Sequence, residues 1–191
     1  IIDEVMTGFG RTGKFFASGY MHRKPDIICL SKGLTGGTMA MGITACNQKI
    51  YDAYVTDDAL KTFFHGHSFT ANPIACAASL ASLDLLTQQN TIGKIEWITG
   101  ENKSFAKQLE AQIETLQIKN IRTLGTILAF EIAKGDDVYL NNISQHFTQS
   151  CMAKGVYLRP LGNTVYVMPP YCITADELQK VFDTITEVLL A

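Results

Sequence analysis

The sequence predicts an α/β fold over residues 1–90 and a smaller α+β domain over residues 91–191. In the first part, short apolar runs follow one another between glycine-rich loops with little polar alternation, which is typical of strands buried on both faces of a sheet. In the second part, long segments with helical spacing surround short strand-like pairs, as in helices over an antiparallel sheet. We therefore expect residues 1–90 to be the end of a larger α/β domain.

The composition supports a globular chain of this kind. The 191 residues are 47% hydrophobic and 18% charged, so they supply a core and are too apolar for intrinsic disorder. The net charge of −2 argues against a nucleic-acid or anionic-membrane surface. No apolar run approaches the roughly 18 residues that a membrane span needs.

Cysteine and histidine usage indicates a compartment and argues against a metal centre. The five cysteines are widely spaced and form no Cys-x-x-Cys pair, which predicts buried free thiols in a reducing cytoplasm. The four histidines supply no zinc-ligand spacing with any cysteine, so we expect no metal site.

Three short apolar runs of the first part are predicted to be strands: residues 1–5, 27–30 and 39–46. Glycine-rich loops over residues 7–13 and 31–37 separate them. Asn72 and Pro73 mark a helix start, because Asn caps helices and Pro suits the first helical position.

The second part begins with a long amphipathic stretch in which apolar residues from Ile95 to Leu116 keep helical spacing. Residues 117–132 then form a predicted strand pair, and a polar helix is expected over residues 137–154.

The end of the chain carries the clearest local signals. Residues 155–160 and 163–170 are predicted to form a hairpin around Leu161–Asn163. Thr174 and Glu177 form a capping box before a last helix, whose apolar positions mark one face.

One glycine-rich loop resembles a nucleotide-binding motif. Gly8 to Lys14 satisfies most of the P-loop pattern, but Phe15 replaces the hydroxyl residue that should hold Mg²⁺. The expected apolar helix does not follow. A nucleotide-binding module is therefore a minor alternative.

Lys32 and Asp3 are the residues best placed for chemistry. Lys32 follows a buried apolar strand directly, at the strand end where open α/β sheets form their ligand crevice. Partial burial there would lower the pKa of the amine and make it a usable nucleophile. Asp3 ends the neighbouring strand, so both side chains could reach one crevice. A carboxylate beside a pyridine nitrogen keeps that nitrogen protonated, which a carbanion-stabilising cofactor requires.

Four segments resemble, in order, the motifs of the class III pyridoxal-phosphate (PLP) aminotransferases: IIDEVMTGFGRTGKFFAS, PDIICLSKGLTGG, FFHGHSFTANPIACAASLASL and GVYLRPLGNTVYVMPPY. They run from residue 1 to about residue 171. The resemblance implies the fold-type I (aspartate aminotransferase-like) architecture, with residues 1–90 in the PLP-binding large domain. The family normally has over two hundred further residues before this point. Because the chain also opens inside a strand without an initiator Met, we expect it to be the C-terminal half of a longer protein.

The resemblance implies roles at the strand ends and in one loop. Lys32 matches the lysine that joins the cofactor and then moves a proton on the substrate, and Asp3 matches the partner of the pyridine nitrogen. Gly66, His67 and Ser68 match a segment that in the family crosses to the cofactor of the other subunit. Ser68 would meet the cofactor phosphate where Thr is usual, His67 stands where the most similar members carry Pro, and Gly66 would border the substrate. The implied partner is therefore a second copy of the chain.

Further matches lie outside these loops. Arg159 matches the arginine that grips the substrate carboxylate, for which a planar guanidinium is well suited. Tyr166 and residues 168–171 match a substrate-binding segment, and Arg11 resembles an arginine with a supporting role. The implied reaction moves an amino group from a donor amine through PLP to a keto acceptor. The alternatives are a class III transaminase for ω-amino acids and a catalytically silent fragment.

Overall fold

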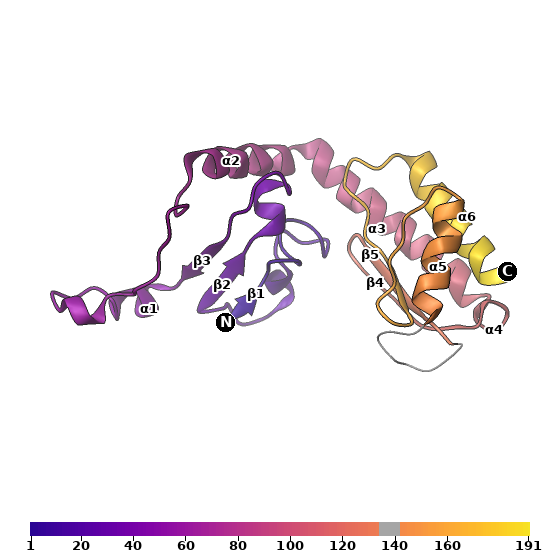
Figure 1. Cartoon of the computed structure of the whole chain (residues 1–191), viewed down its shortest axis with the longest axis horizontal. Helices are drawn as coiled ribbons and strands as arrows, with labels where there is room; N and C mark the ends of the chain where they lie inside the picture. Colours follow the sequence, from indigo (N-terminus) through magenta and orange to yellow (C-terminus); the bar gives the residue numbers. More distant parts are fainter. Residues whose placement is uncertain (134–141) are drawn as a thin grey trace. The chain divides into compact units, whose positions relative to one another are not determined.

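The computed structural model describes residues 1–133 and 142–191, which divide into two compact units, Ile1–Ile92 and Gly93–Ala191 (Figure 1). Both units combine strands and helices. No helix in the described ranges combines the length and the apolarity that a membrane crossing requires.

Unit 1 is built on a three-stranded sheet in the order β1 (Ile2–Asp3), β2 (Ile27–Leu30) and β3 (Ile43–Cys46). β1 runs parallel to β2, with Asp3 opposite Cys29, and β3 runs antiparallel to β2. The expectation of strands buried on both faces is wrong, because every position of β2 is half-buried and every position of β3 is exposed. Three short strands and one long helix give unit 1 too little apolar surface to cover both faces.

Two helical elements flank this sheet. The 3₁₀ turn η2 (Lys32–Thr35) follows β2, and α2 (Pro73–Thr87) packs against it. α2 begins as predicted, since Asn72 Oδ1 accepts the Ile74 amide at 2.9 Å and Pro73 holds the first helical position. Ser82 Oγ of α2 donates to the carbonyl of Gly33 at 3.1 Å, which fastens the helix to the turn after β2.

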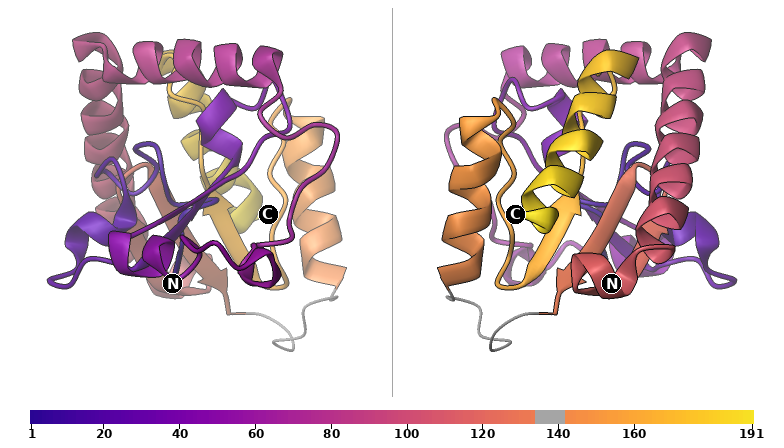
Figure 2. Two further views of the ribbon diagram at one scale, coloured as in Figure 1. Left: turned by 90° about the vertical axis from the view of Figure 1, so that its left-hand side faces the viewer. Right: turned by 90° about the vertical axis from the view of Figure 1, so that its right-hand side faces the viewer.

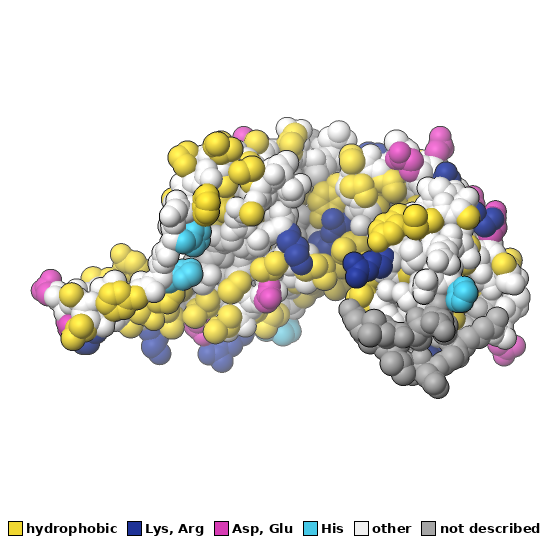
Figure 3. Space-filling model, in the orientation of Figure 1, with side chains coloured by type: hydrophobic (Ala, Val, Ile, Leu, Met, Phe, Trp, Pro, Cys, Tyr) yellow, Lys and Arg dark blue, Asp and Glu magenta, His cyan; other side chains and the backbone are white. Residues whose placement is uncertain are grey.

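The chain between β3 and α2 runs out from the sheet and returns, as Figure 1 shows. It contains the short helix α1 (Gln48–Asp52) and the 3₁₀ turn η3 (Ala59–Lys61). We call residues 48–70 the arm. Most of its large apolar side chains are exposed, and Figure 3 shows apolar side chains gathered along the extension; the exposed ones include Tyr51, Tyr54, Val55, Leu60, Phe63, Phe64 and Phe69.

Unit 2 is an antiparallel sheet covered by helices on one face. Its strands lie in the order β4 (Ile118–Leu124), β5 (Ile127–Ile132) and β6 (Thr164–Val167). The right-hand view of Figure 2 shows the helices over one face of this sheet: α3 (Gln89–Glu110), α5 (Asn142–Ala153) and α6 (Ala175–Leu190). The short helix α4 (Ile113–Leu116) joins α3 to β4.

The core of unit 2 lies between these helices and the sheet. Phe105 of α3 and Phe182 of α6 stack with their ring centroids 4.2 Å apart. The fully buried positions include Ile98, Leu128, Phe130, Val165 and Ile185. The predicted capping box is confirmed, because Thr174 Oγ1 accepts the Glu177 amide and Glu177 Oε2 accepts the Thr174 amide.

The predicted hairpin near residue 160 is only half correct. Its turn is present, with Gly162 at φ +60° and paired hydrogen bonds between Leu161 and Thr164. Residues 155–160 form no strand, although their burial alternates as in one. Their carbonyl groups find partners in α5 instead: Thr148 Oγ1 donates to Leu158 and Ser144 Oγ donates to Pro160.

Two other predictions are corrected in part. The helix expected over residues 137–154 is present as α5 from Asn142, and residues 137–141 lie outside the described ranges. All five cysteines are free thiols as predicted, but only Cys151 is buried, and Cys46 and Cys172 are exposed. Burial raises the pKa of the Cys151 thiol to about 11, so that thiol is protonated and unreactive at neutral pH.

Candidate active site

Asp3 and Lys32 lie at the carboxyl ends of two hydrogen-bonded parallel strands. Asp3 is the last residue of β1 and pairs with Cys29, and Lys32 comes two residues after β2 ends at Leu30. Both side chains are exposed. Because the carboxyl ends of parallel strands meet at the same edge of a sheet, a carboxylate and a primary amine are presented there together.

The backbone of Lys32 is in the left-handed region, with φ +44°. This conformation costs a non-glycine residue roughly 1–2 kcal/mol, and it persists only where neighbouring contacts impose it. The Leu34 amide donates to the Ser31 carbonyl at 3.0 Å, and the Gly37 amide donates to the Lys32 carbonyl at 3.3 Å. A strained lysine held at a strand end is typical of a functional position.

Glu4, next to Asp3, is fully buried and was not singled out from the sequence. Its carboxylate accepts the amides of Ala17 and Ser18, at 3.0 and 2.6 Å, and the hydroxyl of Thr7. Burial alone would raise the pKa of Glu4, but the hydrogen bonds from Thr7, Ser18 and Ala17 outweigh it and lower that pKa. Glu4 therefore fastens both Thr7, at the start of the glycine-rich loop, and the turn at Ala17 and Ser18 to the end of β1. The sequence offers one signal for this role: Glu4 is the second of two consecutive acidic residues that precede the glycine-rich loop.

Phe9 joins the glycine-rich loop to the turn that carries Lys32. Its ring packs edge-on against Phe15 and Phe16, with centroids 6.0 and 5.7 Å away. A Cβ atom at Gly33 would lie only 3.0 Å from the Phe9 ring, so this contact requires glycine at position 33. Arg11 is half-buried in the same loop.

The nucleotide-binding alternative finds no support in this loop. The Lys14 ammonium donates to the Gly19 carbonyl at 2.7 Å and lies 4.3 Å above the centre of the Tyr20 ring. The next helical element, η1 (Ala17–Tyr20), is a single 3₁₀ turn. A P-loop needs a long helix whose N-terminus faces the phosphates.

Gly66, His67 and Ser68 lie at the end of the arm, directly before α2, and all three are exposed. Rings along this segment form a row, with the His65 and His67 centroids 6.4 Å apart and the His67 and Phe69 centroids 6.3 Å apart. Among the described residues, no hydrogen bond, ion pair or ring contact joins Gly66, His67 or Ser68 to Asp3 or Lys32.

Arg159 and Tyr166 belong to unit 2. Arg159 is exposed on the segment between α5 and β6, and Tyr166 is half-buried in β6 opposite Ala129. The side chain of Tyr166 lies on the sheet face away from the core, because its neighbours Val165 and Val167 are core residues. The structure thus brings Asp3 together with Lys32 in unit 1, and Arg159 and Tyr166 are held by unit 2.

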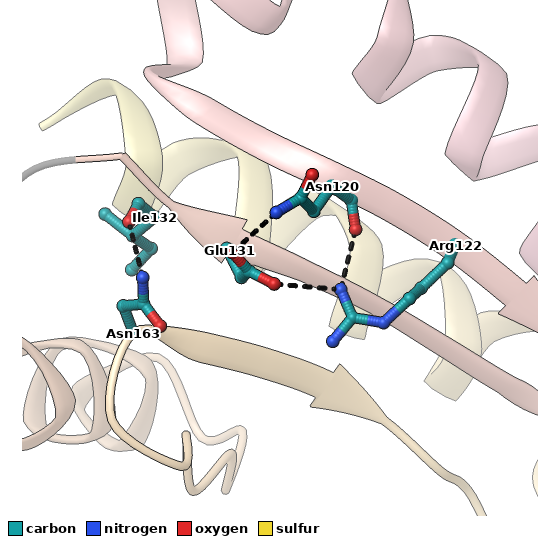
Figure 4. Close-up of polar contacts among 5 residues, drawn as sticks. All are labelled: Asn120, Arg122, Glu131, Ile132 and Asn163. Carbon is teal, nitrogen blue, oxygen red and sulfur yellow. Dashed lines mark hydrogen bonds and ion pairs between the residues drawn. The ribbon is translucent and has the colours of Figure 1, made fainter. Parts of the chain in front are cut away.

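Arg122 lies in the same cross-strand row as Tyr166 and was not identified from the sequence. It pairs with Ala129 in β5, and its guanidinium contacts Glu131 at 3.2 Å and the Asn120 carbonyl at 2.8 Å (Figure 4). Asn120 also donates to Glu131 at 2.8 Å from a backbone with φ +52°, where the β4–β5 register shifts. These contacts are internal to the sheet, so we assign Arg122 a structural role.

Comparison with known sequences matches the chain to a known family over nearly its whole length. The family model described as aminotransferase class-III matches residues 1–189. The chain is 42% identical to the adenosylmethionine-8-amino-7-oxononanoate aminotransferase of Synechococcus elongatus, over 99% of this chain and 43% of that protein. It is 37% identical to the protein of that name in Helicobacter pylori, with the same coverage. The chain thus spans less than half the length of these curated relatives.

Solved structures agree in fold. The adenosylmethionine-8-amino-7-oxononanoate aminotransferase of Methanocaldococcus jannaschii matches with a TM-score of 0.85 at 33% identity, over 97% of this chain and 44% of that one. An aminotransferase of Bacillus anthracis matches with a TM-score of 0.86 at 28% identity, over 98% of this chain and 43% of that one.

Proposed function

This chain belongs to the class III aminotransferase family, whose members depend on PLP, and we propose that the complete protein catalyses transamination at the edge formed by β1 and β2. The predicted fold class is confirmed by the family and by its structural neighbours. The observation that carries the proposal is the placement of Asp3 and Lys32 on the ends of adjacent parallel strands.

The residues at this edge fit PLP by their chemistry. The aldehyde of PLP needs a primary amine, and the pyridine nitrogen needs a carboxylate; Lys32 and Asp3 supply these groups on exposed side chains. Within residues 1–133 and 142–191, no ion pair engages either side chain. Asp3 accepts the Val5 amide at 2.9 Å, which orients its carboxylate and leaves acceptor capacity on it.

Each residue then has a defined task. When bound, PLP carries the amino group between the two half-reactions and takes up the negative charge that develops on the substrate. Asp3 keeps the pyridine nitrogen protonated, and Lys32 holds the cofactor and moves a proton at the substrate carbon. Ser68 binds the phosphate, and His67 belongs to the same loop.

We assign the substrate contacts mainly to unit 2. Arg159 binds a carboxylate through two parallel N–H donors, and Tyr166 borders the same substrate from β6. Gly66 of the arm is proposed as a further substrate contact; it lies in open space, since a Cβ at that position would meet no atom within 4 Å.

For the reaction, we propose that 8-amino-7-oxononanoate accepts the amino group and that S-adenosylmethionine donates it, as a step of biotin synthesis. The names of the most similar curated relatives support this choice, at 33–42% identity. The alternative of an ω-amino-acid transaminase is less well supported: a solved structure described as an omega-transferase from Vibrio fluvialis is 26% identical.

The complete protein is proposed to be a cytoplasmic homodimer. The arm exposes large apolar side chains together with Gly66–Ser68, and such a surface favours burial against another protein surface. A second copy would bring Ser68 to the cofactor phosphate of its neighbour.

An activity assay of the complete protein tests the proposed reaction. Lys32→Ala removes the proton-transferring amine and is expected to reduce turnover to background, whereas Lys24→Ala, at an exposed position in the same unit, leaves turnover unchanged. Formation of 7,8-diaminononanoate is measured by mass spectrometry with S-adenosylmethionine, lysine or an ω-amino acid as donor. Turnover that survives in Lys32→Ala contradicts the assignment, and use of ω-amino acids alone selects the alternative.

A further inference from the structure

A tight turn, His67-Ser68-Phe69-Thr70, carries Ser68 at the end of the arm. Three hydrogen bonds close it. The Thr70 amide donates to the His67 carbonyl at 3.0 Å, the His67 amide donates to Thr70 Oγ1 at 3.1 Å, and the Phe69 amide donates to His67 Nδ1 at 3.1 Å. The Asn72 amide donates to the Phe69 carbonyl at 3.1 Å, so the turn is tied to the N-cap of α2.

The imidazole of His67 takes part in this turn as an acceptor. Nδ1 can accept a hydrogen bond only when it carries no proton, so the turn requires the neutral ring with its proton on Nε2. Protonation turns Nδ1 into a donor that faces the donor N–H of Phe69. The hydrogen bond is then lost, and the turn keeps only the two bonds between His67 and Thr70.

The surroundings of the ring add to this sensitivity. His65 and Phe69 are the rings in contact with His67 among the described residues, and His65 is the titratable one. No ion pair in the described ranges involves the turn, so no acidic side chain is paired with a protonated ring. Two imidazolium rings about 6 Å apart would repel one another, which also favours opening.

We propose that His67 is a positioning residue for Ser68, and that protonation of its imidazole releases the turn. The bond from the Phe69 amide to the neutral His67 ring spans Ser68, so it fixes the backbone on both sides of Ser68. The proposal rests on the proposed role of Ser68 as a phosphate contact. It predicts that the phosphate of PLP is held more weakly when the His67 ring is protonated than when it is neutral.

Two substitutions separate the hydrogen bond from the charge. Asn at position 67 offers Oδ1, which accepts from the amide two residues later and does not titrate. Ala at position 67 offers no acceptor. Both variants remove the titratable ring. His67→Asn keeps an acceptor for the Phe69 amide, whereas His67→Ala loses it.

The first test is an NMR titration of the 191-residue chain from pH 8 to pH 5, which needs no cofactor. In the wild type, the Phe69 amide resonance is expected to move as the His67 ring takes up a proton and the bond to Nδ1 is lost. In His67→Asn, the Phe69 chemical shift should stay at every pH near the value that the wild type shows at pH 8. In His67→Ala, it should stay near the value that the wild type shows at pH 5. His65→Asn serves as the control: it removes the neighbouring ring but keeps the bond from the Phe69 amide to His67, so the Phe69 resonance should still change between pH 8 and pH 5.

Two results would overturn the proposed hydrogen-bond switch. One is a Phe69 amide chemical shift that still changes with pH in His67→Asn. The other is a Phe69 chemical shift that is the same at pH 8 in the wild type, His67→Asn and His67→Ala. Neither depends on PLP, so failure here is distinguishable from failure of the proposed function.

A second measurement tests the link to Ser68. The dissociation constant of PLP from the complete protein is measured at pH 8 and pH 5.5 by its visible absorption. Loss of one hydrogen bond predicts that affinity falls by an extra factor on the order of three to ten in the wild type relative to His67→Asn. An equal fall in both proteins would contradict a role of the turn in holding the phosphate.

Discussion

Two neighbouring acids at the end of β1 have opposite environments. Asp3 is exposed, whereas Glu4 is fully buried and accepts three hydrogen bonds from the loop that follows. Successive side chains of a strand point to opposite faces, so one carboxylate of the pair is exposed and the other is turned inward, where it holds the following segment. The position of Asp3 thus depends on Glu4.

The role of Glu4 predicts a pH-dependent stability. Its pKa is lowered by folding, so its contribution is fully present above the ordinary carboxyl value of 4.5 and is lost as pH falls through the lower folded value. Glu4→Gln places an amide against the Ala17 and Ser18 donors and is expected to lower the unfolding free energy by about 1–3 kcal/mol at pH 7. Urea unfolding at pH 7 and between pH 5 and 3 measures both effects.

The matched control for Glu4 is Asp57→Asn, at an exposed position of the same unit. It should leave the unfolding free energy within about 0.5 kcal/mol of the wild type. If Glu4→Gln behaved like Asp57→Asn, Glu4 would not be the anchor of the loop.

Among the elements, the glycine-rich loop and the turn after β2 act as one unit through Phe9 and Gly33. A Cβ at position 33 would come within 3.0 Å of the Phe9 ring, which packs against Phe15 and Phe16. Because Lys32 precedes Gly33, a displacement of Phe9 is transmitted to the backbone of the candidate catalytic lysine.

Gly33→Ala is therefore expected to destabilise unit 1 by roughly 1–3 kcal/mol through overpacking. Gly42→Ala is the control, because a Cβ there meets its nearest atom at the ordinary distance of 3.6 Å. Thermal or urea unfolding measures both, and adding Phe9→Leu to Gly33→Ala should restore part of the loss. Absence of any rescue in the double variant would argue against the Phe9 contact as the cause.

Local signals in the sequence predicted some elements well. The start of α2 at Asn72-Pro73 and the capping box at Thr174 depend on neighbouring residues only, and both are confirmed. Residues 155–160 have the alternation of a strand, but their carbonyls bond to hydroxyls of α5, which is a tertiary contact that no local pattern encodes. The anchoring by Glu4 was missed for the same reason, since its partners lie up to 14 residues away.

In the whole chain, the site residues predicted from the sequence fall in both compact units. Asp3, Lys32 and the 66–68 segment belong to unit 1, and Arg159 and Tyr166 belong to unit 2. Strand ends and motif order pointed to Asp3 and Lys32 in the sequence, and the structure has Asp3 at the end of β1 and Lys32 just after the end of the adjacent parallel strand β2. The joint role of these seven residues is a proposal for the complete protein, because the chain spans only 43–44% of the length of relatives such as those in Synechococcus elongatus and Methanocaldococcus jannaschii.

The proposed binding of PLP by Lys32, at the edge formed by β1 and β2, can be measured on the 191-residue chain itself. The chain is incubated with PLP and reduced with borohydride, and the labelled lysines are mapped by mass spectrometry of its peptides. A pyridoxyl label concentrated on Lys32 is expected, with less label there in Asp3→Asn and an unchanged background on exposed lysines such as Lys24. Equal labelling of Lys32 and Lys24 would exclude a specific PLP site at this edge.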